Sequence, residues 1–118
     1  MIISDKYIEI IKPDDWHVHL REDEMLRAVI NSTSRINGRC IAMPNLSSPI
    51  ISAEKCIKYK RTIQKLLGKK KLDCFVPCYL TENLDLSIFR DSLEKNIFFG
   101  AKLYPSNSTT NSEFGISN

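Results

Sequence analysis

The chain of 118 residues has no apolar run near the roughly 20 residues that a membrane-spanning helix needs. Its apolar N-terminal start has no basic flank and no small-residue cleavage site, so no signal peptide is expected. The net charge of +3 is too small to indicate nucleic-acid binding. These absences together predict a soluble, cytoplasmic protein with neither a membrane nor a nucleic acid as partner.

Cysteine and glycine are also scarce, with four residues of each. The cysteines form no Cys-x-x-Cys pair and no zinc-ribbon spacing, which favours free thiols in a reducing compartment. No glycine-rich loop of the phosphate-binding kind follows any predicted strand, so nucleotide binding loses its main support. With 42% hydrophobic and 26% charged residues, the composition is that of a single globular domain over residues 1–118.

Apolar residues alternate between the two-residue period of strands and the 3.6-residue period of helices. Helices are predicted from about residue 25 to the turn at Asn37 and Gly38, from the N-cap Ser52 to Gly68, and over residues 86–95. A short first strand is predicted at 7–13, and four further strands that alternate with these helices are predicted at 14–20, 39–43, 73–81 and 97–104. This alternation predicts an α/β fold with a parallel sheet, either open and doubly wound or closed into a barrel.

The predicted strand at 14–20 carries two histidines, His17 and His19, separated by one residue. Side chains at i and i+2 of a strand share a face, with Trp16, Val18 and Leu20 expected on the other face. Two imidazoles on one face are able to hold one divalent ion, although ordinary partly buried histidines give the same pattern. Zinc sites use three or four protein ligands, so further ligands would have to come from elsewhere.

Three other polar residues follow or interrupt predicted strands, where chemistry collects in parallel α/β folds. Lys102 stands in an apolar strand; it either extends its ammonium to solvent or becomes neutral and reacts with carbon dioxide to give a metal-bridging carbamate. Arg21 and Asn45 are suited to bind a carboxylate. A surface arginine and an Asx turn are the alternatives for that pair.

Three stretches, in this order, resemble the first half of dihydroorotases of the single-chain bacterial type, members of the amidohydrolase superfamily. They are DDWHVHLRE at residues 14–22, AMPNLSSPI at 42–50 and GAKLYPSNSTTNSEFGI at 100–116. Related cyclic-amide hydrolases resemble only the first stretch this well. The resemblance implies the N-terminal half, about four βα units, of a metal-dependent (β/α)₈ TIM barrel, as one incomplete domain over residues 1–118.

The resemblance also implies a function and a set of site residues. The family interconverts L-dihydroorotate and N-carbamoyl-L-aspartate in de novo pyrimidine biosynthesis, with two Zn²⁺ ions per complete site. His17 and His19 would bind the more buried zinc, and Lys102, carboxylated by carbon dioxide, would bridge the two ions. Arg21 and Asn45 would bind the carboxylate of the small-molecule substrate.

The departure from the family pattern concerns later strands. In the family, two further histidines and an aspartate on later strands complete the metal site and supply the general acid/base, and His17 and His19 are the only histidines here. No catalytic acid/base is therefore assigned within these 118 residues. An alternative hypothesis is a non-catalytic half-barrel fragment or decayed gene product that binds at most one metal or a partner chain. Open strand edges would then favour self-association into a homo-oligomer.

Overall fold

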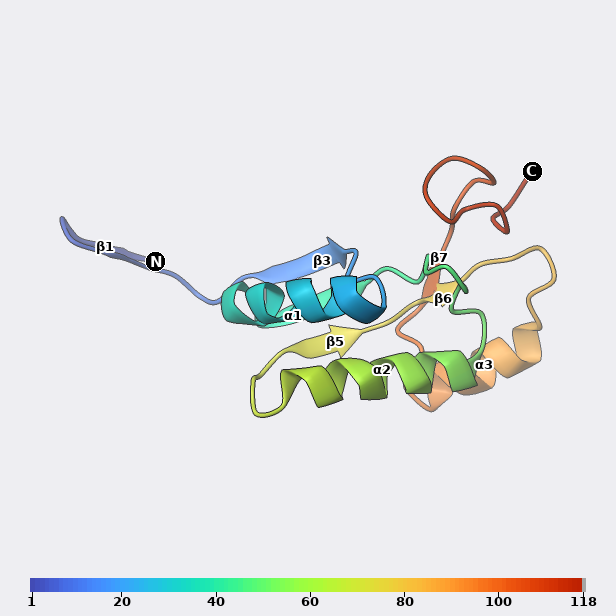
Figure 1. Cartoon of the computed structure of the whole chain (residues 1–118), viewed down its shortest axis with the longest axis horizontal. Helices are drawn as coiled ribbons and strands as arrows, with labels where there is room; N and C mark the ends of the chain where they lie inside the picture. Colours follow the sequence, from blue (N-terminus) through green and yellow to red (C-terminus); the bar gives the residue numbers. More distant parts are fainter. Residues whose placement is uncertain (118) are drawn as a thin grey trace.

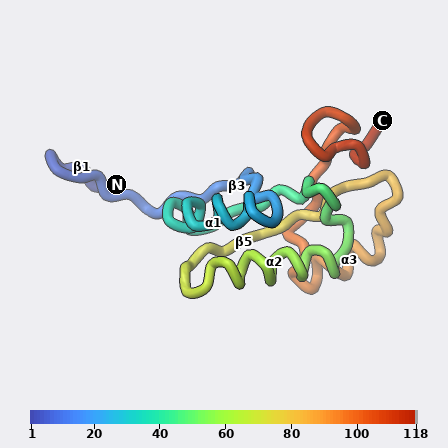
Figure 2. The backbone as a smooth tube through the Cα atoms, viewed as in Figure 1, coloured from blue at the N-terminus to red at the C-terminus, as the bar shows by residue number. Residues whose placement is uncertain are grey.

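The computed structural model describes residues 1–117 as an elongated α/β body with an N-terminal hairpin extending from one end (Figure 1). Its principal extents are 55 × 29 × 29 Å. The hairpin pairs β1 (Ile2–Ile3) antiparallel with β2 (Ile8–Glu9). The tube in Figure 2 shows that the hairpin lies clear of the helices. Its isoleucine side chains are exposed, so the hairpin adds little to the core.

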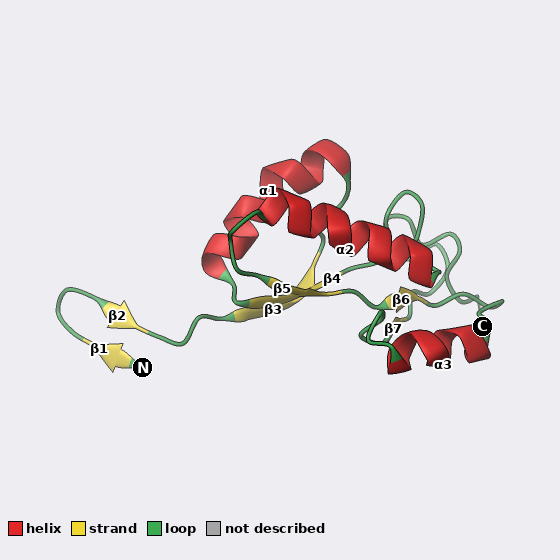
Figure 3. Cartoon of the chain, turned by 90° about the horizontal axis from the view of Figure 1, so that it is seen from below, coloured by secondary structure: helices red, strands yellow, loops and turns green. Residues whose placement is uncertain are grey.

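The centre of the body is a parallel three-stranded sheet in the order β3 (Asp14–Val18), β4 (Arg39–Ala42) and β5 (Asp73–Phe75). Helices α1 (Asp23–Ile36) and α2 (Ala53–Leu67) supply the crossovers and lie together on one face of the sheet (Figure 3). The core forms between these two layers and includes Leu26, Ile30, Cys40, Ala42, Cys56 and Ile63. The predicted alternation of parallel strands and helices is confirmed.

The chain continues through a second, two-stranded parallel sheet that pairs β6 (Cys78–Tyr79) with β7 (Ala101–Lys102). Helix α3 (Leu86–Glu94) connects these strands and lies beside them (Figure 3). The register places Tyr79 opposite Lys102. Residues 105–117 then fold into a compact loop, referred to below as the 105–117 loop, which returns to Tyr104: the Ile116 amide donates to the Tyr104 carbonyl at 2.8 Å.

Local sequence accounts for the helix boundaries. Helix α2 begins after Ser52, whose side chain accepts from the Lys55 amide, and ends at Gly68, which has a positive φ of 59° that glycine adopts readily. Helix α3 begins after Asp85, whose carboxylate accepts from the Ser87 and Ile88 amides. The predicted bounds of both helices agree with the structure to within one residue. Among residues 1–117, none of the helices has the length and apolarity to cross a membrane.

Several predicted strands are shorter than their apolar patterns indicated. The strand predicted at 73–81 is divided into β5 and β6 around the buried Pro77, which has no amide hydrogen to donate. The strand predicted at 97–104 is reduced to β7, and that at 7–13 to β2, whose partner β1 was not predicted. The four cysteines are free, as expected.

The predicted face of Trp16 was wrong. Its side chain is 48% exposed, whereas Leu20 is fully buried. The register between β3 and β4 shifts between Asp15 and Val18, so strict alternation of side chains is not maintained through Trp16. The Trp16 ring instead lies 5.1 Å from the guanidinium of Arg39, a cation–π contact at the surface.

Candidate functional site

Two hydrogen bonds hold the loops that follow β3 and β4. One links α2 to the β3 loop, and the other links the two loops to each other. Arg21, in the β3 loop, has a left-handed backbone with φ 58°, which is uncommon for a residue other than glycine. The Tyr59 hydroxyl of α2 donates to the Arg21 carbonyl at 2.8 Å. In the β4 loop, the Ser47 amide donates to the Glu22 carboxylate at 2.7 Å. These contacts fix the two loops that carry Arg21 and Asn45.

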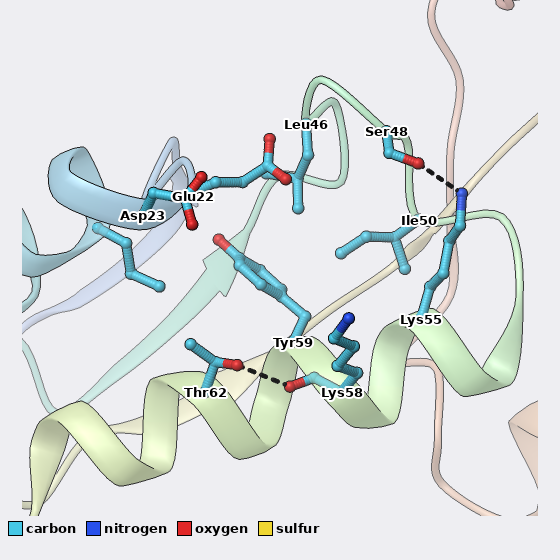
Figure 4. A pocket seen from close by; sticks show the side chains of 10 residues that line it. Glu22, Asp23, Leu46, Ser48, Ile50, Lys55, Lys58, Tyr59 and Thr62 are labelled. Atoms are coloured by element: carbon cyan, nitrogen blue, oxygen red, sulfur yellow. Dashed lines mark hydrogen bonds between the residues drawn. The ribbon is translucent and has the colours of Figure 1, made fainter.

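A cavity of about 280 Å³ lies behind this junction, between the start of α1 and the first half of α2 (Figure 4). The Tyr59 ring and the Lys58 and Lys55 side chains line it, and the Lys55 ammonium donates to the Ser48 hydroxyl at 2.7 Å. The five predicted site residues are absent from its lining. This cavity therefore lies among the residues that hold the loops in place and is not the predicted metal and substrate site.

The two histidines lie side by side, as predicted. The ring centroids of His17 and His19 are 5.2 Å apart with an interplanar angle of 52°. His17 is exposed, whereas His19 is half-buried and its Nδ1 atom is buried with no hydrogen-bond partner among the described residues. A buried nitrogen without a partner costs free energy unless another group, such as a metal ion, pairs with it.

Burial is the main cause that lowers the pKa of His19 below 6.5. The positive charges of Arg21, His17 and Lys102 lower the pKa of His19 further, whereas the nearby Asn45 side chain raises it. A lowered pKa keeps the imidazole neutral at physiological pH, and the neutral imidazole is the form that ligates metals.

Lys102 is half-buried on β7, and its ammonium lies 5.6 Å from the centroid of the Tyr104 ring. Within residues 1–117, His, Cys, Asp and Glu form no group of three that could hold a metal ion. The residues thus fit a metal ion in part. The histidine pair supplies two nitrogens, fewer than the three or four protein ligands of a zinc site.

Asn45 is 1% exposed, and each end of its side-chain amide makes a hydrogen bond within the chain. Its Oδ1 accepts from the Tyr104 hydroxyl at 3.0 Å, and its Nδ2 donates to the carbonyl of Thr110 at 2.9 Å. The Arg21 guanidinium donates to the backbone carbonyl of Asn45 at 3.3 Å. Arg21 and Asn45 are therefore in contact, as a shared carboxylate site requires, and the 105–117 loop covers the Asn45 amide.

Sequence reasoning missed two residues of this neighbourhood, Tyr79 and Tyr104. Their rings stack with centroids 5.0 Å apart and an interplanar angle of 26°, and both are buried. In the sequence, each tyrosine lies in an apolar stretch and looks like an ordinary core residue. The available signal was the position of Tyr104 two residues after Lys102, on the same face of the predicted strand.

Comparisons with known proteins give a consistent result. No protein-family profile matches the chain. The dihydroorotase of Yersinia enterocolitica is 42% identical over 99% of this chain, and that of Pectobacterium atrosepticum is 46% identical over 92%. The chain spans about a third of the length of these relatives, 34% and 32% respectively.

Solved structures agree in fold. The dihydroorotase of Campylobacter jejuni matches 91% of this chain with a TM-score of 0.83 and 31% identity, and the chain covers 31% of it. The Saccharomyces cerevisiae dihydroorotase, solved in complex with 5-fluoroorotic acid, matches 88% with a TM-score of 0.77 and 33% identity, and the chain covers 28% of it.

These dihydroorotases are TIM-barrel amidohydrolases, so the predicted fold class is confirmed, with about a third of a relative's length in place of the predicted half. In sequence and in fold, the chain is similar to part of these dihydroorotases, over about a third of their length.

Proposed function

We propose that the chain supplies part of the active site of a zinc-dependent dihydroorotase, which interconverts L-dihydroorotate and N-carbamoyl-L-aspartate in pyrimidine biosynthesis. The observation that carries this proposal is the buried His19 Nδ1 without a hydrogen-bond partner among the described residues, on an imidazole that lies beside His17. The contact of Arg21 with Asn45, and the Tyr104 ring that contacts both Asn45 and Lys102, support it. Sequence identity of 42% and 46% to dihydroorotases supports the same reaction class.

His17 and His19 are the proposed zinc ligands, and Lys102 is the proposed third ligand after carboxylation. In that modification the neutral amine of Lys102 forms an N–C bond to carbon dioxide and releases a proton, and the resulting carbamate is an anionic oxygen ligand. A bound zinc ion would supply Lewis acidity, lowering the pKa of a water and polarising a carbonyl.

Arg21 and Asn45 are the proposed carboxylate-binding pair. The guanidinium offers planar N–H donors, and the Asn45 amide offers the N–H group that now donates to Thr110. Substrate would therefore replace the Thr110 carbonyl at Asn45 Nδ2. The yeast relative binds 5-fluoroorotic acid, a ring that carries a carboxylate, and a ligand of that kind matches this donor pair.

Ligand binding tests the proposal. In zinc and bicarbonate, L-dihydroorotate should bind the chain, whereas dihydrouracil, which lacks the carboxylate, should bind at least about tenfold more weakly. Arg21→Gln should weaken L-dihydroorotate binding about 10- to 100-fold and leave dihydrouracil unchanged. Arg61→Gln, on the exposed side of α2, is the matched control. Equal affinity for the two ligands, or equal effects of the two arginine substitutions, would contradict the proposed carboxylate site.

A further inference from the structure

The two stacked tyrosines contact both Lys102 and the 105–117 loop. Tyr79 is fully buried and Tyr104 is 5% exposed. Their hydroxyl groups point to different partners: that of Tyr79 donates to the Asn111 carbonyl at 3.2 Å, and that of Tyr104 donates to Asn45 Oδ1 at 3.0 Å. Of these two hydroxyls, that of Tyr104 is the one bonded to a residue of the proposed substrate site.

The Tyr104 hydroxyl and the Thr110 carbonyl together hold the Asn45 amide, one at each end of the group. A side-chain amide carries an oxygen acceptor and a nitrogen donor that exchange places when the group rotates by half a turn. In the observed orientation Oδ1 faces Tyr104 and Nδ2 faces the Thr110 carbonyl. Rotation would bring Oδ1 against that carbonyl, placing two acceptors together. The donor end of Asn45 is thus held toward the 105–117 loop, on the side where substrate is proposed to bind.

The same tyrosine ring also contacts Lys102. The Lys102 ammonium lies 5.6 Å from the ring centroid, and the register of β6 and β7 places Lys102 opposite Tyr79, on which the ring stacks. One buried ring therefore touches both the residue proposed to bind the substrate carboxylate and the residue proposed to become a metal ligand. Removal of the hydroxyl alone would leave the Lys102 contact and the stack in place.

We propose that Tyr104 is a positioning residue, whose hydroxyl fixes the Asn45 amide with its N–H donor toward the substrate carboxylate. The role in catalysis rests on the proposed function, whereas the fixed orientation of Asn45 does not. A phenylalanine at position 104 would leave Asn45 Oδ1 buried without the Tyr104 donor, and the amide would keep its hydrogen bond to the Thr110 carbonyl, which substrate is proposed to replace. The N–H donor would then be held less firmly toward substrate.

The test compares Tyr104→Phe with wild type by two measurements, using Tyr7→Phe as a matched control. Tyr7 is 61% exposed in the N-terminal hairpin. In Tyr104→Phe, the Asn45 side-chain amide signals should shift in NMR spectra and its protons should exchange with solvent about tenfold faster or more. Affinity for L-dihydroorotate should fall about tenfold, while zinc affinity and affinity for dihydrouracil stay within about twofold. Tyr7→Phe should change none of these quantities.

Unchanged Asn45 amide signals in Tyr104→Phe would overturn the positioning role, as would an equal loss of zinc, dihydrouracil and L-dihydroorotate affinity, which indicates general loosening. If wild type binds no L-dihydroorotate, the proposed function fails, and the amide signals still decide the role of Tyr104. If Tyr104→Phe does not fold, wild type decides it: a slowly exchanging Tyr104 hydroxyl proton close to the Asn45 side chain supports the proposal, and its absence overturns it.

Discussion

Replacing Gly115 by alanine should release the 105–117 loop from the body. A Cβ atom at this position would lie 2.3 Å from the Tyr104 carbonyl oxygen, 3.0 Å from that of Ser112 and 3.1 Å from the Tyr104 carbonyl carbon. All three neighbours are backbone atoms, so no side chain can rotate away. Overpacking of this kind costs about 1–3 kcal/mol. The strain falls on the hydrogen bond from the Ile116 amide to the Tyr104 carbonyl, 2.8 Å long.

Hydrogen exchange measures this release directly. A cost of about 1–3 kcal/mol corresponds to an increase of roughly 5- to 150-fold in the exchange rates of the Ser106 and Ile116 amides, both bonded across the base of the loop. Gly100→Ala is the matched control, since a Cβ there meets nothing within 4 Å. The packing explanation would be refuted if these amides exchanged in Gly115→Ala at the wild-type rate, or if Gly100→Ala accelerated their exchange equally.

Three further substitutions test the fold. Ser52→Ala removes the N-cap of α2 and should lower the free energy of unfolding by about 1 kcal/mol in urea titrations, whereas the exposed Ser32→Ala should not; equal effects would contradict the capping role. Ile63→Ala, at a side chain 2% exposed, should cost about 2–5 kcal/mol against less than about 0.5 kcal/mol for Ile88→Ala, which is 60% exposed; similar costs would place the core elsewhere. Arg39 lowers the pKa of Asp14 below 3.8, so their ion pair stabilises the fold above that pH and the contribution is lost as pH falls through the lowered pKa. The stability difference between wild type and Asp14→Asn should therefore shrink in acid, and a difference independent of pH would rule out the ion pair as its cause.

The helices and the order of the strands were predictable from the sequence because each depends on local signals. Ser52 caps the start of α2 with a hydrogen bond, Gly68 ends the helix with a positive φ, and the apolar residues between them have helical spacing. The face of Trp16 was not predictable, since it depends on a register shift between two strands that are distant in sequence. The β1–β2 hairpin was missed because strands of two residues have no period to detect.

The residues of the candidate site were predictable in type and only partly in arrangement. The spacing of His17 and His19 placed both on one face, and their rings are 5.2 Å apart. The contact of Asn45 with Tyr104 joins residues separated by 59 positions, and no local pattern reports such a pairing. The hydrogen bond from the Asn45 amide to the Thr110 carbonyl likewise depends on the three-dimensional path of the 105–117 loop.

The zinc affinity of the purified chain, measured by competition with a chromophoric chelator, tests the proposed metal site most directly. His17→Asn and His19→Asn should each weaken zinc binding about tenfold or more, and Lys102→Arg should weaken it in bicarbonate but not in carbonate-free buffer. Cys74→Ser, the control for adventitious binding by thiols, should leave the affinity unchanged. Zinc binding that survives both histidine substitutions and is lost in Cys74→Ser would contradict the proposed site.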